Sequence, residues 1–474
     1  MNRRSLLSFY GRAVDGMATW LTPQRLRVYP TAVAVITLLA WLLSLVLGPG
    51  LTDVTHTIIG LDFSTFYMAG RFLLEGHLAE LYDFSAQQAF QASLIAPVLS
   101  SNFDPFINPP FAVLLYIPFA WGSYLTGLWL WWGAGLAALT LSLYLLRQEL
   151  RLPRAWSTGR LVLMSACFFP TLTWFIHGQM TALTLLLYTG IFLLLRREHD
   201  FAAGIVLGCL VYKPQLVIAL GVMLLVKWRW RVLLGGLVSA GLWLWAGFAL
   251  SPAAMREYIR ISPWLFDLLR SGVDSRWSLA ASYPTWRIHS LYGFSVLLLD
   301  GVWKTAADGL AILLTIGGLG VVAFAWRRAA WRPGARAWDL TLAGTVALGL
   351  LISPHLSLYD LMLLLLPFAI VWSYYPHGAN GRPLDGGPLL AWTAALYVIA
   401  FVGSYLSAAQ LWLSGALGLP IFAVQVSTLI IAGWAWVVMR LAQDPSLTEP
   451  EPYTKSTSSP TAMRFKKSGE VSRT

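Results

Sequence analysis

The sequence predicts an all-α polytopic membrane protein, and three observations lead to that fold class. Only 12% of the 474 residues are charged and 57% are hydrophobic, whereas about 25% of the residues in a soluble domain are charged. The mean hydropathy is +0.64. Apolar runs long enough to cross about 30 Å of hydrocarbon recur along the chain, and they lack the alternation of a transmembrane β-barrel. We expect a bundle of about twelve transmembrane helices with helical extracytoplasmic loops.

The basic residues predict the orientation of this bundle. The net charge is +11, but the arginines and lysines cluster between apolar runs, so we expect the bilayer and not a nucleic acid as the partner. The clusters are Arg3, Arg4, Arg12, Arg25 and Arg27; Arg147, Arg151, Arg154 and Arg160; Arg196 and Arg197; Lys227, Arg229 and Arg231; and Arg327, Arg328, Arg332 and Arg336. By the positive-inside rule these segments are cytoplasmic. The chain is therefore expected in a bacterial inner membrane, with both termini in the cytoplasm.

Three parts follow from the pattern of apolar runs. Residues 1–28 form a cytoplasmic N-terminal segment, residues 29–440 a transmembrane domain, and residues 441–474 a polar tail that we expect to be disordered and cytoplasmic. Two large outer loops, 51–106 and 251–305, interrupt the domain. The second loop is basic, which indicates an anionic ligand or anionic headgroups outside; a solvated loop with incidental charge explains it equally well.

The boundaries of the crossings follow from the same runs. We expect crossings near 30–49, 124–146, 161–177, 180–195, 201–212, 214–226, 232–250, 306–326, 338–353, 357–374, 388–406 and 418–439. Pro214 divides the stretch from Ala202 to Val226, which is either a hairpin or a broken pair of half-helices. The segment from Pro110 to Trp121 does not fit as a crossing, and we expect it to re-enter the membrane or to lie at the interface.

The segment from Gly60 to Arg71 holds the strongest candidate for chemistry. At helical spacing Asp62, Phe66 and Ala69 share one face, which puts a carboxylate beside aromatic rings at the bilayer surface. Such a carboxylate suits a base that acts on a sugar hydroxyl. A second interpretation is open at this point: Asp62 also fits as the N-cap of a helix that begins at Phe63.

Ionisable residues at membrane depth supply further candidates, because each costs roughly 2.5 to 3.5 kcal/mol at the centre of a helix. Lys213 precedes Pro214 between two apolar half-segments. It suits a phosphate, and the alternative is a lysine that snorkels to the surface or pairs with a carboxylate. His177-Gly178-Gln179, and Ser353-Pro354-His355 with the Tyr359-Asp360 that follows, form polar turns at the same level, although turns at helix ends are common for structural reasons alone.

Short motifs in a fixed order add a family resemblance that spans roughly Gly60 to Pro367. They are Asp62-Phe63 with Tyr67 and Gly70-Arg71, Leu81-Tyr82-Asp83, Asn108-Pro109-Pro110-Phe111, Gly178-Gln179, Lys213-Pro214 and Ser353-Pro354-His355. In this order the motifs resemble glycosyltransferase family 87. Its members are integral-membrane GT-C enzymes similar to the polyprenol-phosphate-mannose-dependent alpha-mannosyltransferases of bacteria.

The resemblance implies a function and a set of site residues. A hexose, mannose before others, would pass from a polyprenyl-phosphate-linked donor to a lipid or glycan acceptor at the extracytoplasmic face, with inversion. Asp62 would be the general base. Lys213 and His355, helped by Arg71 or Arg287, would bind the donor phosphate. The expected substrate-binding residues are Tyr67, Tyr82, His177, Gln179 and Asp360, and we expect neither a metal nor another cofactor.

Two other classes of function are weighed against this one. A secondary transporter or flippase would also use half-helices around Pro214 and a buried lysine, but it predicts an internal repeat that the two halves of the chain do not display. A non-catalytic component of an envelope assembly predicts loss of the functional set, whereas Asp62, Lys213 and His355 are all present.

Overall fold

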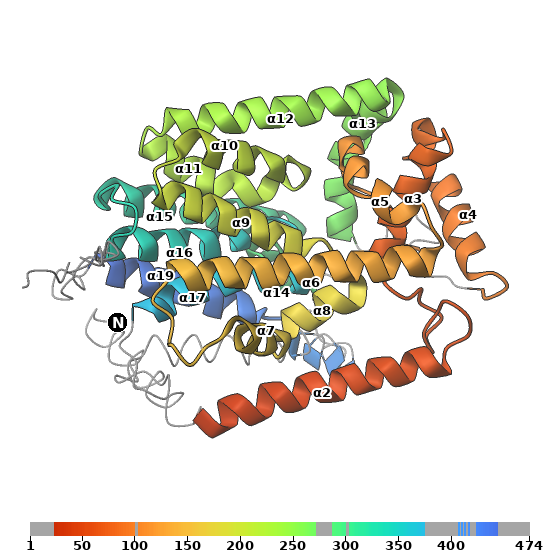
Figure 1. Ribbon diagram of the computed structural model, residues 1–474, viewed down its shortest axis with the longest axis horizontal. Helices are drawn as coiled ribbons and strands as arrows, with labels where there is room; N and C mark the ends of the chain where they lie inside the picture. Colours follow the sequence, from red (N-terminus) through yellow and green to blue (C-terminus); the bar gives the residue numbers. More distant parts are fainter. Residues whose placement is uncertain are drawn as a thin grey trace, which may run out of the picture. The chain divides into compact units, whose positions relative to one another are not determined.

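The computed structural model describes residues 23–99, 103–271, 287–299, 303–374 and 423–443, with eight residues between 406 and 417. All of these belong to one compact unit that ends at Gln443. Their regular secondary structure is entirely helical (Figure 1). Two isolated β-bridges, Thr52–Ile58 and Ile288–Ser357, are the exceptions. The all-helical fold class is therefore confirmed for this part of the chain.

The chain up to Val226 alternates long helices with short ones. Its elements are α2 (Pro23–Leu47), α3 (Leu61–Leu74), η1 (Leu78–Glu80), α4 (Phe84–Ile95), η2 (Pro110–Leu115), α5 (Ile117–Ala120), α6 (Tyr124–Glu149), α7 (Thr158–Ala166), α8 (Phe169–His177), α9 (Thr181–Arg196), α10 (Asp200–Gly208), η3 (Cys209–Tyr212), η4 (Pro214–Val217) and α11 (Ile218–Val226). Polar side chains cap the N-termini of several of these helices. The Ser123 hydroxyl accepts from Thr126 N at the start of α6, and Asp83 accepts from Ser85 N and Ala86 N at the start of α4.

The remaining elements complete the bundle. They are α12 (Trp230–Leu250), α13 (Pro252–Ser271), α14 (Leu291–Leu299), α15 (Lys304–Arg328), α16 (Arg336–Ile352), η7 (Leu358–Leu364), α17 (Leu365–Ser373) and α19 (Val426–Ala442). Glycines bring α10 and α12 close together, because a Cβ at Gly204 would lie 2.1 Å from Val232 O. Small residues at a helix interface allow this approach of two backbones.

Four of the described helices are long and apolar enough to cross a membrane: Val28–Leu47 of α2, together with α6, α12 and α15. A fifth candidate is the pair α7 and α8, which is bent by 80° and occupies the predicted crossing 161–177. The chain is thus a membrane protein, but the count of about twelve crossings is not confirmed. Other predicted crossings fall on helices of at most 17 residues, such as α9 and α19. The crossing predicted at 388–406 lies outside the described residues except for Leu406.

Short elements gather at one end of the bundle, where α6 begins and α12 ends (Figure 1). Here α3 packs on α4, α5 and η2, and α13 packs on η1. The ring of Tyr82 lies 5.7 Å from that of Tyr258 in α13. The segment from Pro110 to Trp121 forms η2 and the four-residue α5, which are too short to cross, in agreement with the expectation that this segment is not a span.

Candidate functional site

Asp62 lies in the first turn of α3, at this end of the bundle. The helix begins at Leu61, directly after Gly60, whose φ of 69° is left-handed, and no side chain caps the helix. The interpretation of Asp62 as an N-cap is therefore wrong. Tyr124 fixes the start of the helix, because its hydroxyl donates to Ile59 O at 2.6 Å and reaches Gly60 O at 3.2 Å. Only 9% of Asp62 is exposed, so the packing of α3 buries a carboxyl group that caps nothing.

The turn between α8 and α9 brings Gln179 to Asp62. Gly178 ends α8 with a φ of 71°, and a Cβ there would lie 2.8 Å from Cβ of Phe63. Trp131 Nε1 donates to Gly178 O at 2.7 Å and holds the turn. Only glycine combines the left-handed backbone with this close approach. The Gly178-Gln179 motif is thus explained by contact with the residue that follows Asp62.

Asp62 is an unusually basic carboxylate. Burial raises its pKa to about 6; hydrogen bonds from Gln179 and Asp104 and the charge of Lys213 oppose this rise, and the charge of Asp360 adds to it. Its Oδ2 atom is buried and has no hydrogen-bond partner among the described residues. A carboxylate with a pKa near neutrality and a free oxygen can accept a proton from a hydroxyl group.

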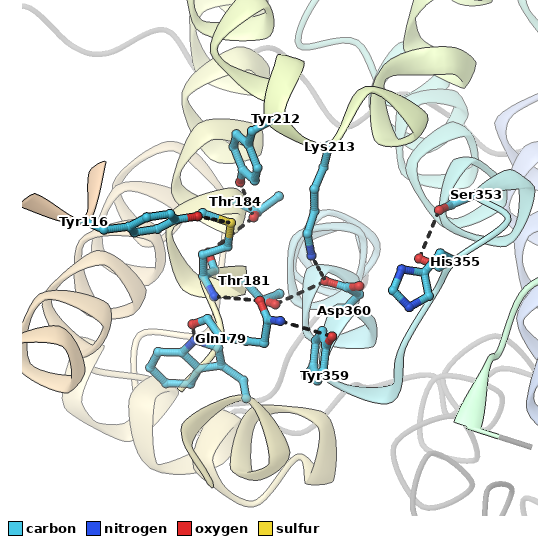
Figure 2. Close-up of polar contacts among 12 residues, drawn as sticks. Tyr116, Gln179, Thr181, Thr184, Tyr212, Lys213, Ser353, His355, Tyr359 and Asp360 are labelled. Atoms are coloured by element: carbon cyan, nitrogen blue, oxygen red, sulfur yellow. Dashed lines mark hydrogen bonds and ion pairs between the residues drawn. The ribbon is translucent and has the colours of Figure 1, made fainter. Parts of the chain in front are cut away.

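Lys213 sits at a break in the helical path between α10 and α11. The 3-10 helix η3 ends at Tyr212, and Pro214 begins η4. Hydroxyl groups one turn apart on α9 hold both sides of the break. Thr184 Oγ1 lies 2.6 Å from Tyr212 Oη (Figure 2). Tyr188 Oη donates to Leu216 O at 2.6 Å. Arg229, which follows α11, forms an ion pair with Asp200 at the start of α10, so the chain doubles back near Pro214. The stretch around Pro214 is thus a hairpin, one of the two forms expected for it.

An ion pair joins Lys213 to Asp360 of η7. Lys213 Nζ lies 2.9 Å from Asp360 Oδ1, and Thr181 Oγ1 donates to the same oxygen at 3.2 Å (Figure 2). The two charged side chains are 13% and 4% exposed. Lys213 Nζ also lies 5.7 Å from the centre of the Tyr359 ring, whose hydroxyl accepts from Gln179 Nε2 at 3.2 Å. The pairing of Lys213 with a carboxylate, one of its three interpretations, is the arrangement that the structure adopts.

His355 lies near this pair, on a loop that pairs with the residues directly after Arg287. His289 N donates to Leu356 O at 2.8 Å, and Ser290 Oγ donates to Pro354 O at 3.1 Å. Burial lowers the pKa of His355 to about 4; the charge of Asp360 opposes this shift and that of Lys213 adds to it. At neutral pH His355 is therefore an uncharged imidazole that offers a hydrogen bond rather than a positive charge.

His177 connects the two parts of the site. Its Nδ1–H donates to Thr173 O at 2.9 Å, and its ring centre lies 6.0 Å from that of Tyr359. Electrostatic interactions couple His177 to both Arg287 and Asp104. The structure thus gathers Asp62, His177, Gln179, Lys213, His355 and Asp360 from among the predicted residues, and the exposed Arg287 interacts with His177.

Three predicted site residues lie in other surroundings. Arg71 forms an ion pair with Glu75, and it stands nine residues, or about 13 Å of helix, beyond Asp62. Tyr67 donates its hydroxyl to Gly122 O at 2.8 Å. Tyr82 donates to Asn108 O at 2.5 Å. The two tyrosine contacts join separate segments, and the Arg71 ion pair lies at the C-terminal end of α3, so the motifs that contain Tyr67, Arg71 and Tyr82 have a structural explanation.

Sequence reasoning missed Asp104 and Thr181 as members of the site. The Asp104 side chain lowers the pKa of Asp62, and Thr181 supports Asp360. A weak signal existed for Asp104, which precedes the Asn108-Pro109 motif by four residues in the same loop. In the described ranges, no three His, Cys, Asp or Glu side chains are arranged to hold a metal ion.

Comparison with known proteins identifies the family of the chain. The sequence model of glycosyltransferase family 87 matches residues 106–354, which include Gln179, Lys213 and Arg287 but neither Asp62 nor Asp360. No curated protein and no solved structure matches the chain. Because the family match covers more than half of the 474 residues, the chain belongs to glycosyltransferase family 87, and it is a membrane glycosyltransferase.

Proposed function

We propose that this protein transfers a hexose, mannose before others, from a polyprenyl-phosphate-linked donor to a lipid or glycan acceptor at the extracytoplasmic face of the inner membrane. The observation that carries the proposal is the buried Asp62 carboxyl of a family 87 chain, which has a pKa of about 6 and whose Oδ2 atom has no hydrogen-bond partner in the described part of the chain. The positive-inside pattern supports the orientation.

The proposed reaction is a single displacement. The acceptor oxygen attacks the anomeric carbon as its proton passes to Asp62, and the bond from that carbon to the phosphate oxygen breaks. The polyprenyl phosphate leaves with the electron pair, and the anomeric centre is inverted. Because the leaving group is a stable anion, the reaction needs no second acid, only positive charge and hydrogen bonds around the phosphate.

Lys213, His355 and Arg287 are the proposed contacts for this phosphate. Lys213 brings the charge, and an incoming phosphate would compete with Asp360 for its ammonium group. His355 offers a hydrogen bond from a neutral ring. Arg71 is left out of this set because of its pairing with Glu75 at the far end of α3. His177, Gln179 and Asp360 remain the proposed contacts for the sugars, with Asp360 also acting as the counter-ion of Lys213.

The proposal also includes the domain organisation and the orientation of the chain in the membrane. Residues 29–440 would form the catalytic domain, with the loop 51–106 holding Asp62, the loop 251–305 holding Arg287, and both ends of the chain in the cytoplasm. Neither a metal nor another cofactor has a step in this reaction.

The test is transfer of a labelled hexose from polyprenyl-phosphate-hexose in membranes that contain the native protein, Asp62→Asn or Asp53→Asn. Asp53 is the matched control: it lies in the same loop, and its Oδ1 accepts from Thr55 N and Thr57 N, which an asparagine oxygen can also do. We expect transfer by the native and Asp53→Asn proteins and its loss in Asp62→Asn. Equal transfer by all three would remove Asp62 from the mechanism. No transfer by the native protein with any polyprenyl-linked sugar would favour a transporter or an assembly component.

A further inference from the structure

The carboxylate of Asp360 is held from two sides. Lys213 Nζ lies 2.9 Å from its Oδ1 atom, and Thr181 Oγ1 donates to the same atom at 3.2 Å (Figure 2). Asp360 is 3% exposed, and Thr181 is fully buried. Thr181 is the first residue of α9, so the carboxylate also lies at the N-terminal end of a 16-residue helix, where the helix dipole favours a negative charge. Asp360 therefore has a hydrogen-bond donor on α9 in addition to the lysine.

The same helix holds the backbone on both sides of Lys213. Thr184 Oγ1 lies 2.6 Å from Tyr212 Oη, and Tyr188 Oη donates to Leu216 O at 2.6 Å. The four-carbon stem of Lys213 can rotate without a shift of this backbone. A change of partner by the ammonium group is thus a movement of one side chain, and it leaves the carboxylate in place beside α9.

We propose that Thr181 is a positioning residue for the donor: its hydroxyl holds the Asp360 carboxylate while the ammonium group of Lys213 turns from Asp360 to the donor phosphate. This inference rests on the proposed binding of that phosphate by Lys213. A buried carboxylate without any partner costs much more free energy than one that keeps a hydrogen bond.

The shared oxygen explains why Thr181 matters most when the phosphate is bound. With Lys213 in place, the ammonium group neutralises Oδ1 of Asp360 and competes with the hydroxyl for it. Once the ammonium group has left, the hydroxyl donates to a fully charged oxygen, and such a hydrogen bond is stronger. Thr181 therefore stabilises the phosphate-bound state more than the empty state, and its removal should weaken binding of the phosphate.

The experiment measures binding of a radiolabelled polyprenyl phosphate that carries no sugar to the full-length protein in detergent. Thr181→Val keeps the shape of the side chain and removes the hydroxyl. We expect its Kd to be about tenfold higher than that of the native protein, which corresponds to about 1.4 kcal/mol. Thr181→Ser keeps the hydroxyl, so its Kd should stay near the native value.

Thr189→Val is the matched control for this substitution. Thr189 lies on the same helix and is fully buried, and its hydroxyl has no hydrogen-bond partner among the described residues. The Kd of Thr189→Val should equal that of the native protein. A tenfold higher Kd in Thr189→Val as well would attribute the loss to the packing of α9 and overturn the inference.

A double-mutant cycle tests whether Thr181 acts through Asp360. Asp360→Asn removes the charge that competes with the phosphate for Lys213, so it should bind polyprenyl phosphate more tightly than the native protein. Without that charge the hydroxyl has no carboxylate to stabilise, and Thr181→Val should leave the Kd of Asp360→Asn unchanged. Contacts of Asp360 with a hexose do not enter, because the probe carries none.

Three further outcomes would overturn the inference. They are a native Kd in Thr181→Val, a raised Kd in Thr181→Ser, and an equal loss of binding from Thr181→Val with and without the Asp360 carboxylate. Binding needs no turnover, so the result is separate from sugar transfer. If the predicted pattern of Kd values is found but the native protein transfers no hexose, the inference holds and the proposed function fails. Absence of binding by the native protein would overturn both the proposed donor and the inference.

Discussion

The Asp62 carboxyl is buried where its charged form is poorly solvated, and this burial lowers the stability of the folded protein. Burial raises its pKa from 3.8 to about 6. A carboxyl whose pKa is higher in the folded state than in the unfolded state destabilises the fold once it is ionised. The same shift makes Asp62 a better base. Burial of Asp62 thus lowers the stability of the fold and raises the basicity of the carboxylate.

Asp62→Asn should therefore stabilise the protein in a pH-dependent way. Below pH 3.8 the carboxyl is protonated in both states, and the variant should match the native protein. Between about pH 4 and pH 6 the native protein loses stability, and above this range the difference should level off on the order of 3 kcal/mol in favour of Asp62→Asn, equivalent to about two pKa units. The thermal unfolding midpoint in detergent from pH 4 to pH 8 measures it. A difference that does not change with pH would contradict the shift.

The pH profile of catalysis should report the same group. The base must be ionised to accept a proton, so kcat/KM for hexose transfer should rise with pH and level off above about 6. His355, with a pKa of about 4, is already neutral throughout this range and should add no second step. Initial rates at subsaturating donor between pH 5 and pH 8 give the profile. A rate that falls across this range would exclude an Asp62 base.

Variants of the Lys213–Asp360 ion pair distinguish a structural role of Lys213 from a role in binding the donor phosphate. Lys213→Gln leaves a buried carboxylate without its partner, which should cost about 3 to 5 kcal/mol of stability. The double variant Lys213→Gln/Asp360→Asn removes both charges and should regain most of that stability, but it should not regain hexose transfer, because the donor phosphate still lacks the lysine. Thermal midpoints and transfer rates of both variants decide the matter. Recovery of transfer in the double variant would make Lys213 purely structural.

At the scale of the element, the α8–α9 turn determines whether Gln179 reaches Asp62. Gly178→Ala puts a Cβ in a left-handed backbone and 2.8 Å from Cβ of Phe63. We expect a loss of about 1 to 2 kcal/mol from the backbone alone and a larger fractional loss of transfer, because Asp62 and Gln179 are pushed apart. Gly221→Ala in α11 is the control, since its Cβ would meet nothing within 4 Å in the interior of a helix.

Thermal stability and transfer of the two glycine variants are measured together. Gly221→Ala should be neutral or slightly stabilising and fully active. If Gly178→Ala kept full transfer, the turn would not matter to the site.

Helix α9 organises the opposite side of the site. Thr181, Thr184 and Tyr188 lie on one face of this helix, at spacings of three and four residues, and their hydroxyls hold Asp360, Tyr212 and Leu216. The broken segment around Lys213 therefore takes its position from a continuous helix. A polar face on an otherwise apolar helix explains how Lys213, in a segment without regular α-helix, keeps a fixed partner.

At the scale of the whole molecule, the proposed orientation predicts which surfaces are accessible from outside the cell. In a background without Cys167 and Cys209, an impermeant maleimide should label Ser93→Cys in α4 in intact cells with a permeabilised outer membrane. Arg154→Cys, between α6 and α7, should be labelled only after the inner membrane is opened. Both positions are exposed. The reverse pattern would put Asp62 on the cytoplasmic side and contradict transfer at the outer face.

The sequence alone determined the class of the molecule. Low charge, long apolar runs and the clusters of arginine predict a helical membrane protein, and short motifs predict the family. Asp62, Gln179, Lys213 and His355 could be selected because each interrupts an apolar pattern, a property visible in neighbouring residues. The number of membrane spans could not be predicted from the sequence, because hydropathy identifies an apolar run but not the 80° bend between α7 and α8.

Only the tertiary structure decided which of the selected residues meet. Asp360 is 147 positions from Lys213 in sequence and 2.9 Å from it in space. Arg71, a motif residue, lies at the other end of its helix. Residue types and their spacing indicate which chemistry a side chain can perform. Its partner, its burial and hence its pKa depend on packing between distant segments, which no local pattern encodes.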